Sequence, residues 1–390
     1  MERRGPKETD TSVWFLYALA FIGQLVSGIV GLAVPIYAYL HGASPFLLGL
    51  IGASGGITYS IMPVIFGVIS DWLRKKRLLL LSTVLYSLPS VLYMTVENPA
   101  LLIPVRVLEW ALMSSFWPPL EALIVEAVSK PVSEALKKFN IAWGSALILS
   151  PLVGGSLISS FSVEAPFMVS LIVSLLTGLL IILLVKEPAN SVPEEASIKR
   201  AGETGEVHGG YDALFFMAVS TALLLSFISG TILSLFPAFA YTLGIPADEI
   251  GLIMLFLGLS RIAAFHQAVK IEARLGMIRV FMLSCVVFTV ASVMMANSYT
   301  SLLFSLCFIA FGFGAGLSYA TCLSFIVGEW GSSRGKAAGI FESILGFGYF
   351  TGSFVSGALS EVTPATSYLF IAILSMSVLA IHLILSKKVS

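Results

Sequence analysis

Apolar residues fill long runs of the chain, and short polar segments separate these runs. A helix needs about 20 apolar residues to cross the hydrocarbon core of a bilayer, so each run predicts a membrane-spanning helix. The pattern predicts twelve spans, at residues 13–40, 45–70, 78–96, 100–127, 140–161, 165–185, 211–242, 250–269, 279–296, 301–327, 337–360 and 367–386.

One polar interruption, at residues 186–210, is much longer than the others and is rich in Pro, Gly, Glu and Ala. This composition predicts a flexible linker. The chain then divides into an N-terminal six-helix bundle (1–185), a cytoplasmic linker (186–210) and a C-terminal six-helix bundle (211–390). Hydrophobic residues make up 57% of the chain and charged residues 11%, against about 25% charged residues in soluble proteins. We therefore expect an all-α integral membrane protein with twelve transmembrane helices.

The positions of lysine and arginine predict the orientation of the chain, because basic loops stay in the cytoplasm. With the N-terminus placed inside, all but two of the 22 basic residues fall in inner segments. The other two, Arg106 and Arg261, lie within spans. We therefore expect a multi-pass protein of a prokaryotic plasma or inner membrane, with both termini cytoplasmic.

The two halves of the chain repeat one another. A shift of 202 residues aligns them without gaps, so that Pro35 meets Pro237, Gly49 meets Gly251, Arg77 meets Arg279, Gly144 meets Gly346 and Gly155 meets Gly357. An even number of spans in each half keeps the two copies in the same orientation. Parallel repeats of this kind are typical of alternating-access transporters whose site lies between the halves.

Three local motifs stand out against this background. They are GVISDWLRKKR (67–77) between spans 2 and 3, RVLEWALMS (106–114) in span 4, and SPLVGG (150–155) in span 5. Together with the two sets of six spans and the long linker, they resemble the major facilitator superfamily of secondary transporters, and its drug/proton antiporter branch in particular. The resemblance covers essentially the whole chain. It implies two pseudo-symmetric six-helix bundles with a small-molecule site between them.

The first motif resembles the family's G-x-x-x-D-R-x-G-R-[RK] pattern, with Trp72 and Arg74 departing from it. The resemblance implies a conformational latch on the cytoplasmic side that involves Gly67, Asp71, Lys75 and Glu126. A charge cluster of this kind can hold one of two states. The alternative is that the basic residues only fix the topology.

The second motif places Arg106 and Glu109 three residues apart, where they can neutralise each other. One interpretation makes Glu109 a protonatable group that Arg106 tunes, and the other makes the two a permanent structural pair. Three further charged residues lie within spans or near their ends and are candidates for proton coupling or substrate binding: Glu121, Arg261 and Glu342. Glu121 can also be a hydrated residue near the cytoplasm, and Glu342 can belong to the cytoplasmic rim.

The third motif, with Gly144 before it, resembles a pattern of proton-coupled antiporters; its residues are Gly144, Pro151, Gly154 and Gly155. Proline kinks a helix, and glycine lets two backbones approach closely. The alternative is ordinary glycine-mediated packing. His266 and His382 lie near the inner ends of their spans, where we expect interfacial side chains.

The chain shows no Walker-type loop and no His/Cys metal spacing. We therefore expect no enzyme, no cofactor, no metal and no nucleic-acid partner, but a monomer in the bilayer that binds a small molecule. The leading hypothesis is proton-coupled efflux of small hydrophobic or amphipathic molecules, because the expected cavity wall is apolar and aromatic. The alternatives are an uptake symporter or uniporter for an organic solute, coupling to sodium instead of protons, and a transporter-like receptor or sensor.

Overall fold

A computed structural model describes residues 10–72, 74–127, 132–185, 209–329 and 334–389. The described chain is helical apart from its short connections. The helices are α1 (Asp10–Leu40), α2 (Pro45–Trp72), α3 (Lys75–Leu85), α4 (Ser87–Thr95), the 3-10 turn η1 (Pro99–Leu101), α5 (Leu102–Ala127), α6 (Val132–Ser160), α7 (Ala165–Leu184), α8 (Gly209–Thr242), α9 (Ala247–Leu275), α10 (Met277–Ala296), α11 (Ser301–Glu329), α12 (Arg334–Ser360) and α13 (Pro364–Val389).

The helices correspond to the twelve predicted spans, with α3 and α4 together forming the third. Within the described residues, eleven segments are long and apolar enough to cross a membrane. Helix α12 is not among them, because many of its residues are Gly and Ser and it carries Glu342. It packs lengthwise against α2 and α8. Two helices extend well beyond the predicted spans, since α6 begins at Val132 and α9 continues to Leu275.

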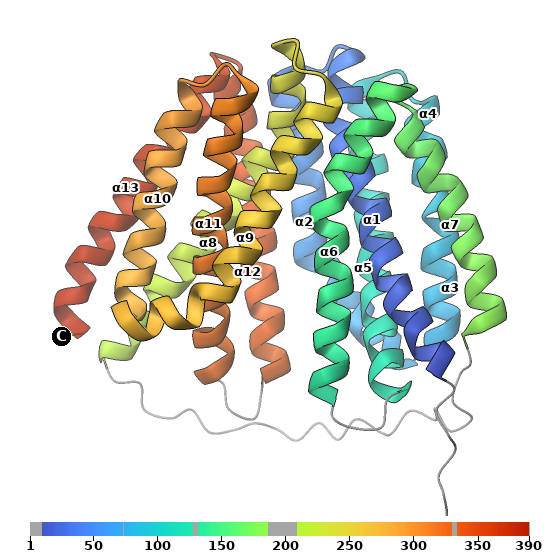
Figure 1. Cartoon of the computed structure of the whole chain (residues 1–390), viewed down its shortest axis with the longest axis horizontal. Helices are drawn as coiled ribbons and strands as arrows, with labels where there is room; N and C mark the ends of the chain where they lie inside the picture. The colour runs from blue at the N-terminus through green and yellow to red at the C-terminus, as the bar shows by residue number, and fades with distance from the viewer. Residues whose placement is uncertain (1–9, 73, 128–131, 186–208, 330–333, 390) are drawn as a thin grey trace, which may run out of the picture.

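The helices form two side-by-side groups, α1–α7 and α8–α13 (Figure 1). Across the division, α2 packs on α12 and α6 packs on α9. The repeat predicted from the sequence recurs in the helix boundaries, because α2 and α9 begin at Pro45 and Ala247, an offset of 202 residues. The fold is therefore two copies of one six-span bundle.

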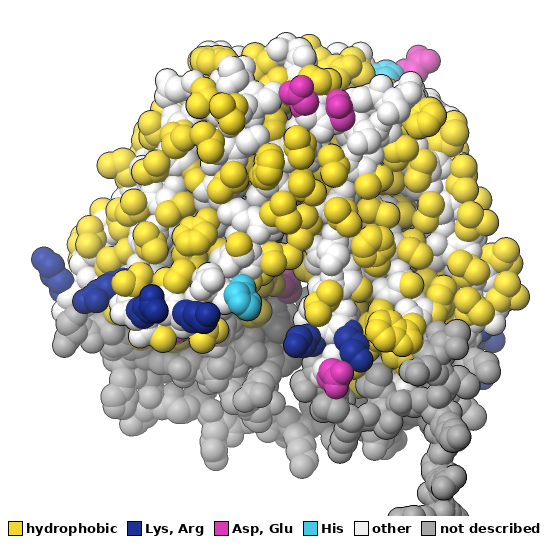
Figure 2. All heavy atoms as spheres, viewed as in Figure 1, with side chains coloured by type: hydrophobic (Ala, Val, Ile, Leu, Met, Phe, Trp, Pro, Cys, Tyr) yellow, Lys and Arg dark blue, Asp and Glu magenta, His cyan; other side chains and the backbone are white. Residues whose placement is uncertain are grey.

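The described chain begins and ends at the same end of the molecule (Figure 1), which we call the inner end. On the face drawn in Figure 2, Lys and Arg side chains gather near the inner end, whereas acidic side chains lie at the outer end as well as near the inner end. Hydrophobic side chains cover the belt between them. This is the distribution expected of a multi-pass membrane protein.

Candidate substrate cavity and coupling residues

A cavity lies between the two bundles and consists of two adjoining chambers. The inner chamber has a volume of about 300 Å³ and includes Tyr59, Trp117, Trp143, Tyr319 and Glu342 in its wall. The second chamber, about 250 Å³, is mostly apolar, and we call it the apolar chamber. Residues common to both walls join the chambers; they are Gln24, Ser27, Trp110, Leu225, Ser229, Leu233, Arg261 and Tyr349. A mostly apolar cavity with a few polar groups is the usual form of a small-molecule site.

The outer halves of the bundles pack closely on each other at positions related by the repeat. A Cβ atom added to Gly56 of α2 would lie 2.6 Å from the Phe350 nitrogen of α12, and one added to Gly258 of α9 would lie 2.9 Å from Ile148 of α6. Both pairs are 202 residues apart in the two copies. Because glycine allows such close approach, the bundles pack tightly from these positions, which line the chambers, toward the outer end.

Glycines of the SPLVGG segment lie in this tightly packed region. A Cβ atom added to Gly155 would lie 2.8 Å from the Ala247 carbonyl carbon, and one added to Gly251 would lie 2.9 Å from the Pro151 carbonyl carbon. Gly154 instead approaches the backbone of Ile29 within its own bundle. Pro151, Gly154 and Gly155 thus all lie at helix contacts, and two of them contact the opposite bundle.

The bundles meet in two interfaces, α2 on α12 and α6 on α9, which the repeat relates to each other. The inner halves of these two interfaces differ. Gly346 of α12 packs on Ser60 of α2, where an added Cβ atom would lie 3.0 Å from the Ser60 Cα atom. The equivalent Gly144 of α6 has no atom within 4 Å of an added Cβ. Figure 2 shows the surface hollowed between the inner halves of α6 and α9. The open space is lined by Leu136, Lys137, Asn140, Ile141, Gly144, Ser145 and Ile262.

Arg106 and Glu109 form a buried ion pair in α5, with 2.7 Å between Arg106 Nη1 and Glu109 Oε2. Tyr93 also donates a hydrogen bond to Oε2 at 2.6 Å, and Tyr86 donates one to Oε1 at 2.9 Å. The Arg106 guanidinium also stacks over the Trp110 ring. Both oxygens of this carboxylate therefore have partners, as a buried charge requires.

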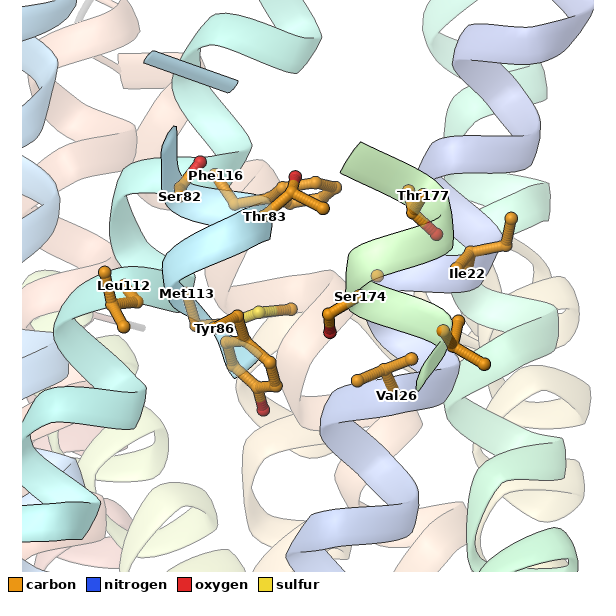
Figure 3. A pocket seen from close by; sticks show the side chains of 12 residues that line it. Ile22, Val26, Ser82, Thr83, Tyr86, Leu112, Met113, Phe116, Ser174 and Thr177 are labelled. Carbon is orange, nitrogen blue, oxygen red and sulfur yellow. The ribbon is translucent and has the colours of Figure 1, made fainter. Parts of the chain in front are cut away.

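A small void adjoins this network on the side away from the interface between the bundles (Figure 3). It has a volume of about 30 Å³, enough for about one water molecule. Two of the hydroxyl groups on its wall have partners, since Ser82 donates to the Leu78 carbonyl and Thr83 to the Leu79 carbonyl. At about 30 Å³ the void is too small for an organic molecule, so the cavity between the bundles is the candidate site.

Glu342 has a different environment from Glu109. Tyr59 donates a hydrogen bond to its Oε2 at 3.1 Å, and Tyr319 donates one to its Oε1 at 3.4 Å. Within the described residues Glu342 forms no salt bridge, and its hydrogen-bond partners are neutral hydroxyls. Because Tyr59 belongs to α2 and Glu342 to α12, this hydrogen bond joins the two bundles at the inner chamber. Glu342 thus lies in the cavity wall rather than at the rim alone.

Arg261 lies on both chamber walls. Its guanidinium stacks over Tyr319, with 5.2 Å to the ring centroid, and over Phe265, with 5.6 Å. Its Nε atom is buried and has no hydrogen-bond partner in the part of the chain that the structure covers. The same part provides no carboxylate within ion-pair distance of Arg261.

The remaining candidates lie toward the inner end. Lys75 of α3 contacts the Glu126 carboxylate of α5, so this pair lies within the N-terminal bundle. The surroundings of Gly67 and of the Asp71 side chain fall outside the described part of the structure, so the expected part of these residues in a latch stays a prediction. Glu121 is exposed and does not line either chamber.

No sequence pattern predicted the tyrosines that donate hydrogen bonds to the buried acids, which are Tyr59, Tyr86 and Tyr93. One signal was available for Tyr59, because the repeat aligns it with Arg261, and both residues line the cavity. The expectation for His382 was wrong. Its side chain is fully buried, and Nε2 lies 2.9 Å from the Ser220 hydroxyl, because α13 packs this face against α8 and α10. His266 is exposed near the inner end of α9.

A model of the family described as Major Facilitator Superfamily matches residues 16–202 and 214–389. The chain belongs to the Major Facilitator Superfamily. An uncharacterized MFS-type transporter of Methanocaldococcus jannaschii is 22% identical over 382 residues, which cover 95% of this chain and 96% of that protein. The quinolone resistance protein NorA of Staphylococcus aureus is 23% identical over 361 residues, covering 90% of this chain and 91% of NorA.

Solved structures share the same superfamily fold. The nucleoside transporter NupG superposes with a TM-score of 0.75 at 17% identity, covering 96% of this chain and 98% of NupG. A bacterial homolog of the human lysosomal transporter Spinster, in an inward-facing and occupied conformation, gives a TM-score of 0.76 at 14% identity and covers 96% of each chain. The chain is thus a multi-pass transporter-family protein, and its all-α architecture of two bundles is confirmed.

Proposed function

We propose that this protein exports small hydrophobic or amphipathic molecules from the cytoplasm in exchange for protons, by alternating access. The observation that carries the proposal is the cavity itself: an apolar chamber closed at the outer end, with an acid, Glu342, on the wall of the inner chamber. Apolar walls suit amphipathic solutes better than sugars, which need many paired donors and acceptors. The similarity to a quinolone resistance protein supports export.

Glu342 is the group to which we assign proton coupling. Glu342 accepts hydrogen bonds from Tyr59 and Tyr319 and forms no salt bridge in the described chain, although Arg261 interacts with it electrostatically. Gain or loss of a proton on Glu342 therefore changes the net charge of the cavity wall. The hydrogen bond from Tyr59 crosses between the bundles, and protonation of Glu342 therefore acts on a contact that must break when the bundles rock. Glu121, which interacts electrostatically with Glu342, is the second acid of this region.

Glu109 is better explained as a structural residue than as the coupling group. Its charge is balanced by Arg106, and both of its oxygens accept hydrogen bonds from buried donors. Breaking such a pair costs several kcal/mol, whereas a coupling group must change its charge in every cycle. We therefore favour the permanent Arg106–Glu109 pair among the two interpretations of the second motif.

Further proposals concern the contacts that close the two ends of the cavity and the orientation of the protein in the membrane. The close contacts of Pro151 and Gly155 with α9 support a role for the third motif in closing the outer end. The Lys75–Glu126 contact fits the part of the predicted latch that lies within the N-terminal bundle, and Asp71 of the same bundle is the residue that would contact the C-terminal bundle. The basic side chains at the inner end support cytoplasmic termini, with the predicted linker at 186–210 on the same side.

The test is transport by purified protein in liposomes with an imposed pH gradient, using a cationic dye and an amphipathic acid as substrates. Glu342→Gln should abolish the dependence of flux on the gradient and leave gradient-independent exchange. Glu134→Gln is a matched control, because Glu134 is an exposed acid at the inner end, paired with Lys138. The assignment fails if Glu342→Gln keeps full coupling, or if Glu134→Gln loses it.

The same assay separates the alternatives. Co-directional movement of protons and solute indicates an uptake symporter, and gradient-independent equilibration indicates a uniporter. A sodium gradient that drives flux where a proton gradient does not indicates sodium coupling. Tight binding without any flux indicates a receptor or sensor.

A further inference from the structure

The cavity contains a cation that forms no salt bridge in the described part of the chain, although Glu342 of the same wall interacts with it electrostatically. Arg106 and Arg261 are both arginines within spans that contribute to the cavity wall. Glu109 neutralises Arg106 at 2.7 Å, but no described carboxylate lies within ion-pair distance of Arg261. An ionised side chain inside a membrane is costly, and such residues usually pair or mark a substrate pathway.

Two aromatic rings hold the Arg261 guanidinium against the cavity wall. Tyr319 and Phe265 lie 5.2 and 5.6 Å below it, and this stacking stabilises the cation without neutralising it. The buried Nε atom has no hydrogen-bond partner among the described residues. The Tyr319 hydroxyl already donates to Glu342, so the ring and the acid are fixed relative to each other. The wall therefore presents a positioned donor with unused bonding capacity.

The repeat shows that the fold does not require a cation here. The equivalent position in the N-terminal bundle is Tyr59, a neutral residue that also lines the inner chamber. Arg261 is therefore a feature of one half only. A scaffold role common to both bundles does not explain it, whereas a ligand that lies asymmetrically between the bundles does.

The surroundings of Arg261 set the shape of the ligand. The apolar chamber extends from Arg261 between side chains such as Leu32, Leu257 and Phe311, without a second unpaired cation among its lining residues. A ligand with its charged end on Arg261 can thus place an apolar body in this chamber. A planar guanidinium binds carboxylates and related oxyanions through two parallel hydrogen bonds.

We propose that Arg261 is the anchor of a binding site for amphipathic organic anions, whose carboxylate pairs with the guanidinium and whose apolar body fills the apolar chamber. This inference rests on the proposed export function and names the substrate class for the same cavity. Arg261 contributes the counter-charge, and the chamber contributes the contact area.

Binding of a matched pair of probes tests the inference. Dansylglycine is an anion at neutral pH, and dansylglycinamide has the same aromatic body without the charge. Energy transfer from Trp110, Trp117 and Trp143, which line the inner chamber, to the dansyl group reports binding in nanodiscs. The wild type should bind the acid about tenfold or more tightly than the amide, the factor expected of a charge-assisted hydrogen bond.

Arg261→Gln should bring the ratio of the two affinities close to one, and Arg261→Lys should keep part of the preference. Arg274→Gln is the control, because Arg274 is an exposed arginine at the inner end of the same helix. This variant should keep the full preference. The wild-type ratio does not depend on any variant folding, and a ratio near one in the wild type overturns the inference.

A preference that survives in Arg261→Gln, or disappears in Arg274→Gln, overturns it equally. A second measurement separates failure of the Arg261 inference from failure of the proposed export function: the flux of a neutral or cationic dye driven by a pH gradient. Coupled flux without any preference for the acid contradicts only the inference about Arg261. The absence of coupled flux contradicts the proposed function.

Discussion

Replacing Gly155 by Ala is expected to open the outer end of the transporter. The added methyl group would lie 2.8 Å from the Ala247 carbonyl carbon and 3.1 Å from the Asp248 Cα atom. Both neighbours are backbone of the opposite bundle, so they cannot move aside by a change of rotamer. The bundles must therefore separate at this point, or the outward-closed state must carry the strain.

Overpacking of this kind costs about 1–3 kcal/mol. The strain exists only while the outer end is closed, so it shifts the equilibrium between the two states by a factor of about 5 to 150. Gly144→Ala on the same helix is the matched control, because no atom lies within 4 Å of its added methyl group. Both substitutions remove a glycine from α6, and only one of them adds a contact between the bundles.

Spin labels at Phe161 and Val362 measure the outcome. These residues lie at the outer ends of the two bundles and are 78% and 76% exposed, and the three native cysteines are buried. Electron–electron double resonance should show a longer outer distance gaining population in Gly155→Ala and an unchanged distribution in Gly144→Ala. An unchanged distribution in Gly155→Ala would refute the reasoning, as would an equal shift in both variants.

Two further predictions concern individual carboxylates. Glu109→Gln leaves Arg106 as an unpaired buried charge, so it should lower the thermal stability of the purified protein, at a cost of about 3–5 kcal/mol; the double variant with Arg106→Gln should recover most of the loss, and an additive loss contradicts the pairing. Outside the spans, hydrogen bonds from the Ser44 hydroxyl and the Phe46 N–H lower the pKa of Glu361 below its ordinary value of 4.5. Ionised Glu361 thus holds Phe46 of the opposite bundle. This contact is fully present above pH 4.5, and it is lost as the pH falls through the lowered pKa of Glu361. The outward-closed population should decrease with acidification in that range and should be independent of pH in Glu361→Ala.

Much of the architecture follows from the sequence, because membrane spans and repeats are properties of local composition. A run of apolar residues must become a helix in lipid, since every backbone group must be satisfied within the segment. The repeat likewise predicts contacts, because the copies pack alike over their outer halves: Gly56 on Phe350 corresponds to Gly258 on Ile148. The family assignment, based on motifs in spans 2, 4 and 5, is confirmed by the match over both halves.

The cavity chemistry follows from the sequence only in part. Sequence spacing places Arg106 beside Glu109, because i,i+3 neighbours share a helix face. It does not place Tyr59 beside Glu342, since these residues belong to different bundles and only the packing of α2 on α12 brings them together. The open space beside Gly144 is a departure from the repeat, and no local pattern in α6 marks it.

The most direct test of the account follows protons and solute in the same liposomes. Wild-type protein is reconstituted with a pH-sensitive dye inside and a fluorescent amphipathic solute on the cytoplasmic side of the protein. A proton gradient should drive the solute in the direction opposite to the proton flux, and a solute gradient alone should move protons in the direction opposite to the solute. Movement of solute and protons in the same direction, or solute equilibration that ignores the gradient, would contradict the account.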